Sequence, residues 1–173
     1  MIDQRKLRGA LVFLTRLLAL AVPFHIMIGY ADLSLLQQMT ARSVHALLSV
    51  FEVGVSLNGA VLRFDGFDVL VSRDSTGWKS AFFLTALIVA TRARQKEKVI
   101  GVFLLVPAIY AINVMRVAVT AYSAFYGVEV FNALHDYLWQ AGMVFVVLAL
   151  WIMWLKEKSK MLANPLNTRK PRL

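Results

Sequence analysis

The sequence predicts an all-α integral membrane protein with about four transmembrane helices, an external amphipathic helix and a small β-ribbon. Three observations lead to this fold class. Hydrophobic residues make up 59% of the 173 residues and charged residues only 17%, with a mean hydropathy of +0.64. This composition lies outside the usual range of soluble domains. Several apolar segments approach the ~20 residues that a helix needs to cross the hydrocarbon core. Basic residues are gathered in short blocks between and beyond these segments, which is typical of cytoplasmic loops.

Four segments are expected to span the membrane, and they lie at about residues 9–30, 77–94, 99–122 and 137–155. The first contains Arg16, which is unfavourable by about 2.5–3.5 kcal/mol at the centre of a span but less so near an end. No A-x-A-like cleavage site follows it, so we expect a retained helix. Residues 1–160 should then form a single membrane domain, followed by a basic cytoplasmic tail at 161–173.

The basic residues also predict the orientation of the chain. Three blocks lie near the N-terminus, between the second and third spans, and after the last span: Arg5, Lys6 and Arg8; Arg92, Arg94, Lys96 and Lys98; Lys156, Lys158, Lys160, Arg169, Lys170 and Arg172. All three blocks, and with them both termini, should be cytoplasmic in a multi-pass membrane protein. The connections 31–75 and 123–136 should be external. The net charge of +9 is explained by this topology, and nucleic acid is not an expected partner.

The long external connection has two parts with different periodicities. Residues 33–53 place apolar side chains at helical spacing on one side, which predicts an amphipathic helix in the membrane interface. Residues 55–72 contain short β-prone runs separated by Asn58-Gly59 and Asp65-Gly66. Such dipeptides are strong hairpin signals, so we expect a β-ribbon that leads into the second span.

Polar residues from three separate parts of the chain should meet at the outer membrane face. Ser75 lies where the ribbon turns into the second span, and His135 lies just before the last span. Arg116 lies 18 residues beyond the cytoplasmic Lys98, which is roughly 27 Å along a helix. These three residues are the candidate site.

Each of the three residues also has an ordinary structural interpretation. Ser75 is of a type preferred at helix N-caps and could cap the helix that follows it. Arg116 could form a structural ion pair with Glu129 or Asp136. His135 could be an interfacial histidine with no chemical role. Their joint placement favours the functional interpretation.

Other chemistries find little support in the sequence. The chain contains no cysteine, which excludes disulfides and thiolate metal sites. There is no H-E-x-x-H pattern and no cluster of acids or histidines with metal-ligand spacing, and phosphate-binding and dinucleotide-binding fingerprints are also missing from the sequence. We therefore expect neither a metal nor a cofactor.

At these residues the sequence resembles the archaeosortase/exosortase family of membrane-embedded cysteine transpeptidases. Three features carry the resemblance, which covers about residues 50–155: Asp74-Ser75-Thr76-Gly77-Trp78-Lys79-Ser80 at the start of a span, Asn113-Val114-Met115-Arg116 late in the next, and His135 before the last. The family has a cysteine where this chain has Ser75. The resemblance implies that residue 75 is the nucleophile, that Arg116 steadies the nucleophile or the oxyanion, and that His135 moves protons.

The resemblance implies further roles around these three residues. Asn113 would orient Arg116, while Thr76 and the backbone at Gly77 would add hydrogen-bond donors at the start of the helix. Family members are understood to recognise a C-terminal signal made of a short motif, a transmembrane helix and a basic cluster. They cleave it at the outer face and pass the new C-terminus to an acceptor. The implied partners are the C-terminal tails of secreted surface proteins, with a membrane lipid as acceptor.

The serine at position 75 affects the expected activity. A serine hydroxyl depends on a well-placed base much more than a thiol does, so we expect this chain to be inactive or slow. A different class of function stays open at this point. A non-catalytic membrane assembly or carrier protein could use Arg116 and Asn113 to hold its helices together.

Overall fold

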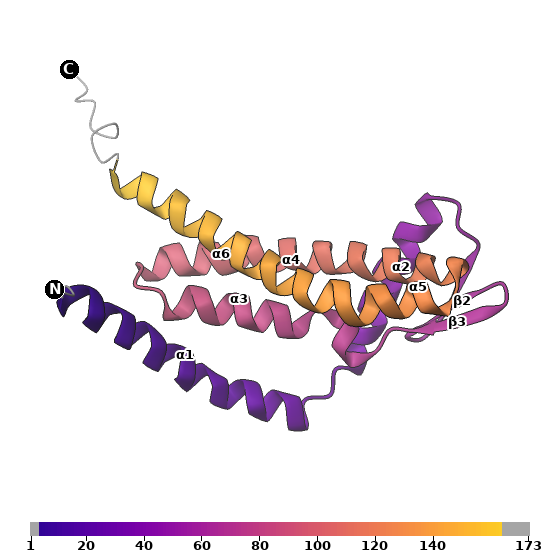
Figure 1. The fold of residues 1–173 in the computed structure, drawn as a ribbon, viewed down its shortest axis with the longest axis horizontal. Helices are drawn as coiled ribbons and strands as arrows, with labels where there is room; N and C mark the ends of the chain where they lie inside the picture. The colour runs from indigo at the N-terminus through magenta and orange to yellow at the C-terminus, as the bar shows by residue number, and fades with distance from the viewer. Residues whose placement is uncertain (1–3, 164–173) are drawn as a thin grey trace, which may run out of the picture.

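The computed structural model describes residues 4–163 and has helices along most of its length (Figure 1). In chain order the elements are α1 (Gln4–Tyr30), α2 (Ser34–Val50), β1 (Val55–Asn58), β2 (Val61–Phe64), β3 (Phe67–Leu70), the 3-10 turn η1 (Arg73–Thr76), α3 (Trp78–Ala90), α4 (Gln95–Ser123), the 3-10 turn η2 (Ala124–Tyr126), α5 (Val128–Asn132), the π-helical segment η3 (Ala133–Leu138) and α6 (Trp139–Ala163). The predicted tail begins too early, because α6 continues through residues 161–163, and the rest of that tail lies outside the described residues.

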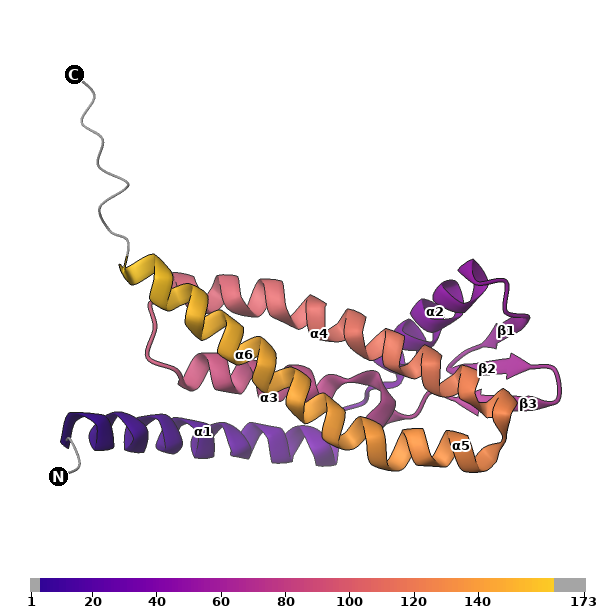
Figure 2. The ribbon, with the colours of Figure 1, turned by 45° about the horizontal axis from the view of Figure 1, so that its top comes forward.

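Helices α1, α3, α4 and α6 run along the long axis of the molecule, and the sheet and α2 lie together beyond one end of α3 (Figure 2). Helix α3 packs against α1, α4 and α6. One core lies among these helices and includes Leu84, Ile88, Ile109 and Val147, all of which are almost completely buried. Burial of these side chains fixes α3 at the centre of the bundle.

Helix α3 is shorter than the span predicted at 77–94. It ends at Ala90, and the next residue, Thr91, has an extended backbone with a ψ of 142°. The Thr91 hydroxyl donates to the Leu87 carbonyl and accepts from the Trp151 indole nitrogen, which holds the chain as it leaves the helix. The prediction was wrong here because residues 91–94 form the turn into α4.

The expectation of four spans is met only in part. Within the described residues, Leu7–Tyr30 and Gln95–Tyr126 are long and apolar enough to cross a membrane, whereas the apolar helix Trp78–Ala90 is shorter. Thirteen residues extend over about 20 Å of helix axis. Crossing by α3 and α6, and the orientation of the termini, remain proposals.

The predicted β-ribbon is confirmed as a three-stranded antiparallel sheet in the order β1-β2-β3. Asn58 pairs with Val61, and Phe64 pairs with Phe67. The second turn is therefore Asp65-Gly66 as predicted, whereas the first consists of Gly59 and Ala60, one residue later than the predicted Asn58-Gly59. One face of the sheet joins α2 and the C-terminal half of α4 in a second core that includes Val44, Leu62, Val117 and Ala121. Part of the apolar face of α2 is therefore buried within the protein instead of lying wholly in the membrane interface.

The connection predicted at 123–136 is helical along most of its length. After η2, the segments α5 and η3 lead directly into α6. The π-helical segment contains His135, so this residue does not lie in a loop before a new helix. Such π-helical turns occur frequently at functional sites, because the wider turn redirects the side chains that it carries.

Candidate functional site

A small cavity brings Ser75, Arg116 and His135 together at one end of the bundle. It has a volume of about 30 Å³, enough for a water molecule or one small group. The other lining residues come from β3, α4 and α5: Val69, Leu70, Val117, Thr120, Ala121 and Phe131. The three candidate residues therefore reach the cavity from η1, α4 and η3, which are remote in sequence.

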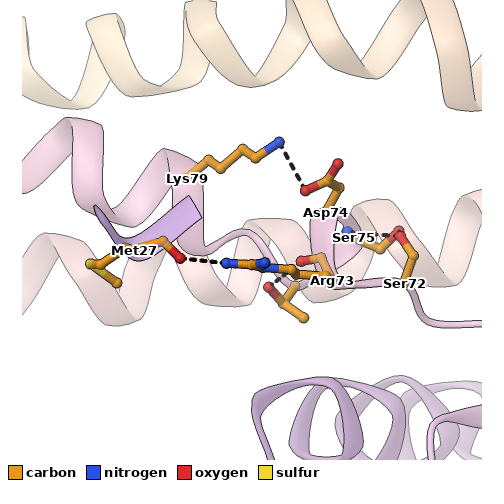
Figure 3. A network of polar contacts seen from close by, with 7 residues as sticks. Met27, Ser72, Arg73, Asp74, Ser75 and Lys79 are labelled. Carbon is orange, nitrogen blue, oxygen red and sulfur yellow. Dashed lines mark hydrogen bonds and ion pairs between the residues drawn. The ribbon is translucent and has the colours of Figure 1, made fainter. Parts of the chain in front are cut away.

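Ser75 is buried and held by Ser72 within the turn η1 (Figure 3). The two hydroxyl oxygens lie 3.0 Å apart, and the Ser72 hydroxyl also accepts from the Ser75 backbone nitrogen at 3.3 Å. Ser72 is thus the residue that caps η1. Sequence reasoning missed this role, although a serine directly before a helical turn is a recognisable N-cap signal.

The interpretation of Ser75 as the cap of the following helix is wrong. The N-cap of α3 is Gly77, and no side chain caps that helix. Gly77 has a φ of +78°, in the left-handed region that glycine adopts without strain. The glycine lets the chain turn from η1 into α3, so the Ser75 hydroxyl is not used to cap α3.

Asn113 fixes the backbone of this turn from α4. Its Nδ2 donates to the Ser75 carbonyl at 2.9 Å, and its side chain is fully buried. A Cβ at position 77 would lie 2.6 Å from Asn113 Cγ, so the close approach requires glycine. The observed partner of Asn113 is Ser75 instead of Arg116, which corrects the predicted orienting role.

Thr76 is also committed to the turn. Its hydroxyl donates to the Arg73 carbonyl at 2.8 Å, and the residue is almost completely buried. Thr76 therefore stabilises η1, and its hydroxyl proton is not directed at the cavity. This corrects the expectation that Thr76 adds a donor at the start of the helix.

Arg116 enters the cavity from α4, between Val114 and Val117, which belong to the second core. The guanidinium is partly buried, and its Nε is buried without a hydrogen-bond partner among the described residues. The suggested ion pair with Glu129 does not form among the described side chains, and the side chain of Asp136 is not among them. A buried donor of a charged group is costly to leave unpaired, so Arg116 is suited to receive an oxygen acceptor from outside the chain.

His135 reaches the cavity from the opposite side. Its ring is exposed and stacks on Phe131, with centroids 5.7 Å apart and planes within 7°. Stacking restrains the plane of the imidazole. Among the described residues, no group of three His, Asp or Glu side chains is arranged to hold a metal ion.

The turn is also tied to the neighbouring elements on both sides. Arg73 donates to the Met27 carbonyl near the end of α1 and lies over the Trp78 ring, while Lys79 pairs with Asp74 at 2.8 Å (Figure 3). From α2, Gln37 donates to the carbonyl of Val71. The turn that carries residue 75 is thus held by contacts from α1, α2 and α3, in addition to the bond from Asn113 in α4.

The fold and the cavity together define a class: a helical membrane protein whose polar site lies where the bundle meets a small sheet. Within that class the particular family is shown by the sequence. Residues 3–155 match the family described as transmembrane exosortase, and the chain belongs to that family. No curated protein and no solved structure gives a match. Membership places the chain, in general terms, among membrane-embedded sorting peptidases and transpeptidases.

Proposed function

We propose that this chain recognises a C-terminal sorting signal, cleaves it at the outer membrane face and transfers the new C-terminus to a lipid or another acceptor. The signal would consist of a short motif, a transmembrane helix and a basic cluster. The observation that carries the proposal is the cavity shared by Ser75, Arg116 and His135. Its residues supply a nucleophile position, a cation and a proton carrier.

The first step would be attack by the side chain of residue 75 on the scissile carbonyl. Ser72 holds the hydroxyl of Ser75, and Asn113 holds its carbonyl, so the attacking atom would have a fixed position. Fixed positioning of reacting groups supplies a large part of enzymatic rate enhancement. The small volume of the cavity means that the peptide would lie across its opening, with only the reacting group inside.

The negative charge that forms during this attack must then be stabilised. Attack on a carbonyl produces an oxyanion, which is stabilised by preorganised donors in a site that excludes water. Arg116 presents a buried Nε with no acceptor among the described residues. His135 lines the same cavity and would take the proton from the nucleophile and return it to the departing amine.

Serine at position 75 limits the rate in this scheme. A helix N-terminus favours an anion by about 0.3–1 kcal/mol when exposed and up to ~2 when partly buried, which is far too little to ionise a hydroxyl near neutral pH. A thiol has a pKa near ~8.5 in the unperturbed state and is more readily ionised by a nearby cation. We infer that the present chain binds its substrate but processes it slowly or not at all.

The test is to compare Ser75→Cys, Ser75→Ala and the present chain on a tail substrate with the three-part signal. Ser75→Cys should cleave the tail much faster than the present chain, and mass analysis should detect a thioester at residue 75. Ser80→Cys is a matched control, because it introduces the same thiol five residues further on, in α3. If Ser75→Ala processes the tail as well as Ser75→Cys does, residue 75 is not the nucleophile.

One observation favours the non-catalytic alternative, an assembly or carrier protein. The bond from Asn113 to the Ser75 carbonyl joins α4 to the start of α3, and buried polar contacts of this kind hold membrane helices together. This alternative predicts that a detergent-solubilised pull-down recovers intact partners with all variants. The enzymatic proposal predicts cleaved tails with Ser75→Cys.

A further inference from the structure

At the end of α3 remote from the cavity, three basic side chains from three helices converge on backbone carbonyls. Lys98 Nζ donates to Val89 O at 2.6 Å, Arg16 Nη1 to Ala90 O at 3.5 Å, and Lys158 Nζ to Arg92 O. We call Arg16, Lys98 and Lys158 the cation cluster. Its members come from α1, α4 and α6, so it forms only when the bundle is assembled.

Stabilisation of a helix end explains only part of this arrangement. The C-terminus of a helix carries the equivalent of about half a negative charge, which is much less than the charge of the cation cluster. Arg92 adds a fourth cation, since its guanidinium lies near α1 beside Gly9. The acids adjacent in sequence are Glu97 and Glu157. Even with both counted, positive charge remains in excess.

The carbonyl contacts leave donors of the cluster available. A lysine ammonium has three donors and an arginine guanidinium has five, and among the described residues each member donates to one carbonyl. Lys98 and Lys158 are half-buried, whereas Arg16 is exposed. An anion at the surface can therefore be approached by several donors at once, in the way that phosphate is bound by grouped basic side chains.

The length of α3 indicates where such an anion comes from. The helix covers about 20 Å, whereas the hydrocarbon core of a bilayer is about 30 Å thick. A short span is accommodated by local thinning of the bilayer, which brings headgroups toward the ends of the helix. At one end they meet the turn at Ser75, where the exposed Asp74 and Lys79 pair with each other, and at the other they meet the cation cluster.

We propose that the cation cluster binds the phosphate of an anionic phospholipid headgroup and so anchors this end of the bundle in the bilayer. Basic clusters between membrane helices are suited to this role, because each cation near the surface adds to the attraction for anionic lipid. The proposal does not depend on the proposed peptidase activity.

The test uses the purified full chain in nanodiscs of phosphatidylcholine, with phosphatidylglycerol added in increasing proportion. Native mass spectrometry would count retained lipids, and the midpoint of thermal unfolding would report stabilisation. Phosphatidylglycerol should be retained in preference to phosphatidylcholine and should raise the midpoint. Each single substitution, Arg16→Gln, Lys98→Gln or Lys158→Gln, should weaken this preference about fivefold, and the triple variant should abolish it.

The matched control is the triple variant Arg8→Gln, Lys96→Gln, Lys156→Gln. It removes the same charge from exposed side chains of the same three helices outside the cluster, so the lipid preference should survive. Equal loss in both triple variants would overturn the proposal in favour of diffuse attraction. Stabilisation by inorganic phosphate alone, without anionic lipid, would also overturn it. If the cluster triple variant does not fold, the folded single variants provide the same comparison.

Discussion

The two ends of α3 are both polar, but they are built in opposite ways. At the cavity end, the side chains of Ser75, Thr76 and Asn113 are buried, and each takes part in a hydrogen bond with η1. At the other end, the half-buried Lys98 and Lys158 donate to the backbone carbonyls of Val89 and Arg92. At the cavity end, hydrogen bonds fix the position of the turn that carries Ser75. At the other end, basic side chains gather positive charge. Polar residues at a helix end therefore do not by themselves indicate a reactive site.

The proposed topology places the two ends of α3 on opposite sides of the membrane, and finding both on one side would contradict it. Reporter tags at Asn58 and Val128 should be accessible from outside intact cells, and a tag at Lys96 should be reached only after permeabilisation, because basic loops stay inside. This is an all-or-none difference. If the Asn58 or Val128 tag requires permeabilisation, the proposed outer position of the cavity is wrong.

The next largest effect should come from Arg116 at the cavity end. In the Ser75→Cys background, Arg116→Lys keeps the charge but changes the donor geometry, so tail cleavage should fall by ~10²–10³-fold. Arg63→Lys is the control, because Arg63 is exposed and pairs with Asp68. Near-normal cleavage by folded Arg116→Ala protein would exclude Arg116 from the mechanism.

A smaller effect, a loss of stability, is expected at Gly77, where the turn at the cavity end packs closely against Asn113 of α4. Gly77 and Gly59 both have positive φ, but only Gly77 has a neighbour that a Cβ would overlap. Alanine at either position should reduce the free energy of unfolding by about 1–2 kcal/mol for the left-handed backbone. Gly77→Ala should lose a further ~1–3 kcal/mol from overpacking against Asn113.

Thermal unfolding in detergent would measure both variants. Measured against Asn113→Ala alone, the added Gly77→Ala change should lose most of its steric cost, because alanine at 113 removes Cγ and Nδ2, which would lie 2.6 and 2.9 Å from the new Cβ, and leaves only Cβ at 3.0 Å. Equal destabilisation by Gly77→Ala and Gly59→Ala would show that the close approach of α4 to this turn has no energetic consequence.

The smallest effect should come from the ion pair between Lys79 and Asp74. Both side chains are about half exposed or more, so Lys79→Gln should change the free energy of unfolding by only ~0.2–1 kcal/mol, and less at high salt. Thermal unfolding at two salt concentrations would measure this. A loss of several kcal/mol would mean that charge, too, is structurally important at the cavity end.

Much of this fold follows from local patterns. The apolar segments, the ribbon with its two turns and the α2 helix were predictable, because helical spacing and the Asn58-Gly59 and Asp65-Gly66 dipeptides act over a few residues. The sequence also singled out Ser75, Arg116 and His135 by residue type and by their expected depth. The structure lines one cavity with all three, while their chemical roles stay predictions.

The tertiary structure decided what depends on contacts between remote residues. Asn113 was predicted to serve Arg116, its neighbour on the helix face, but it binds Ser75, which is 38 residues away. The stop of α3 at Ala90 is reinforced by Trp151 through Thr91. The cation cluster exists because packing brings Arg16, Lys98 and Lys158 from three helices to the level at which α3 ends. Periodicity specifies which face of a helix is polar, but the partner of a buried polar group is set by packing.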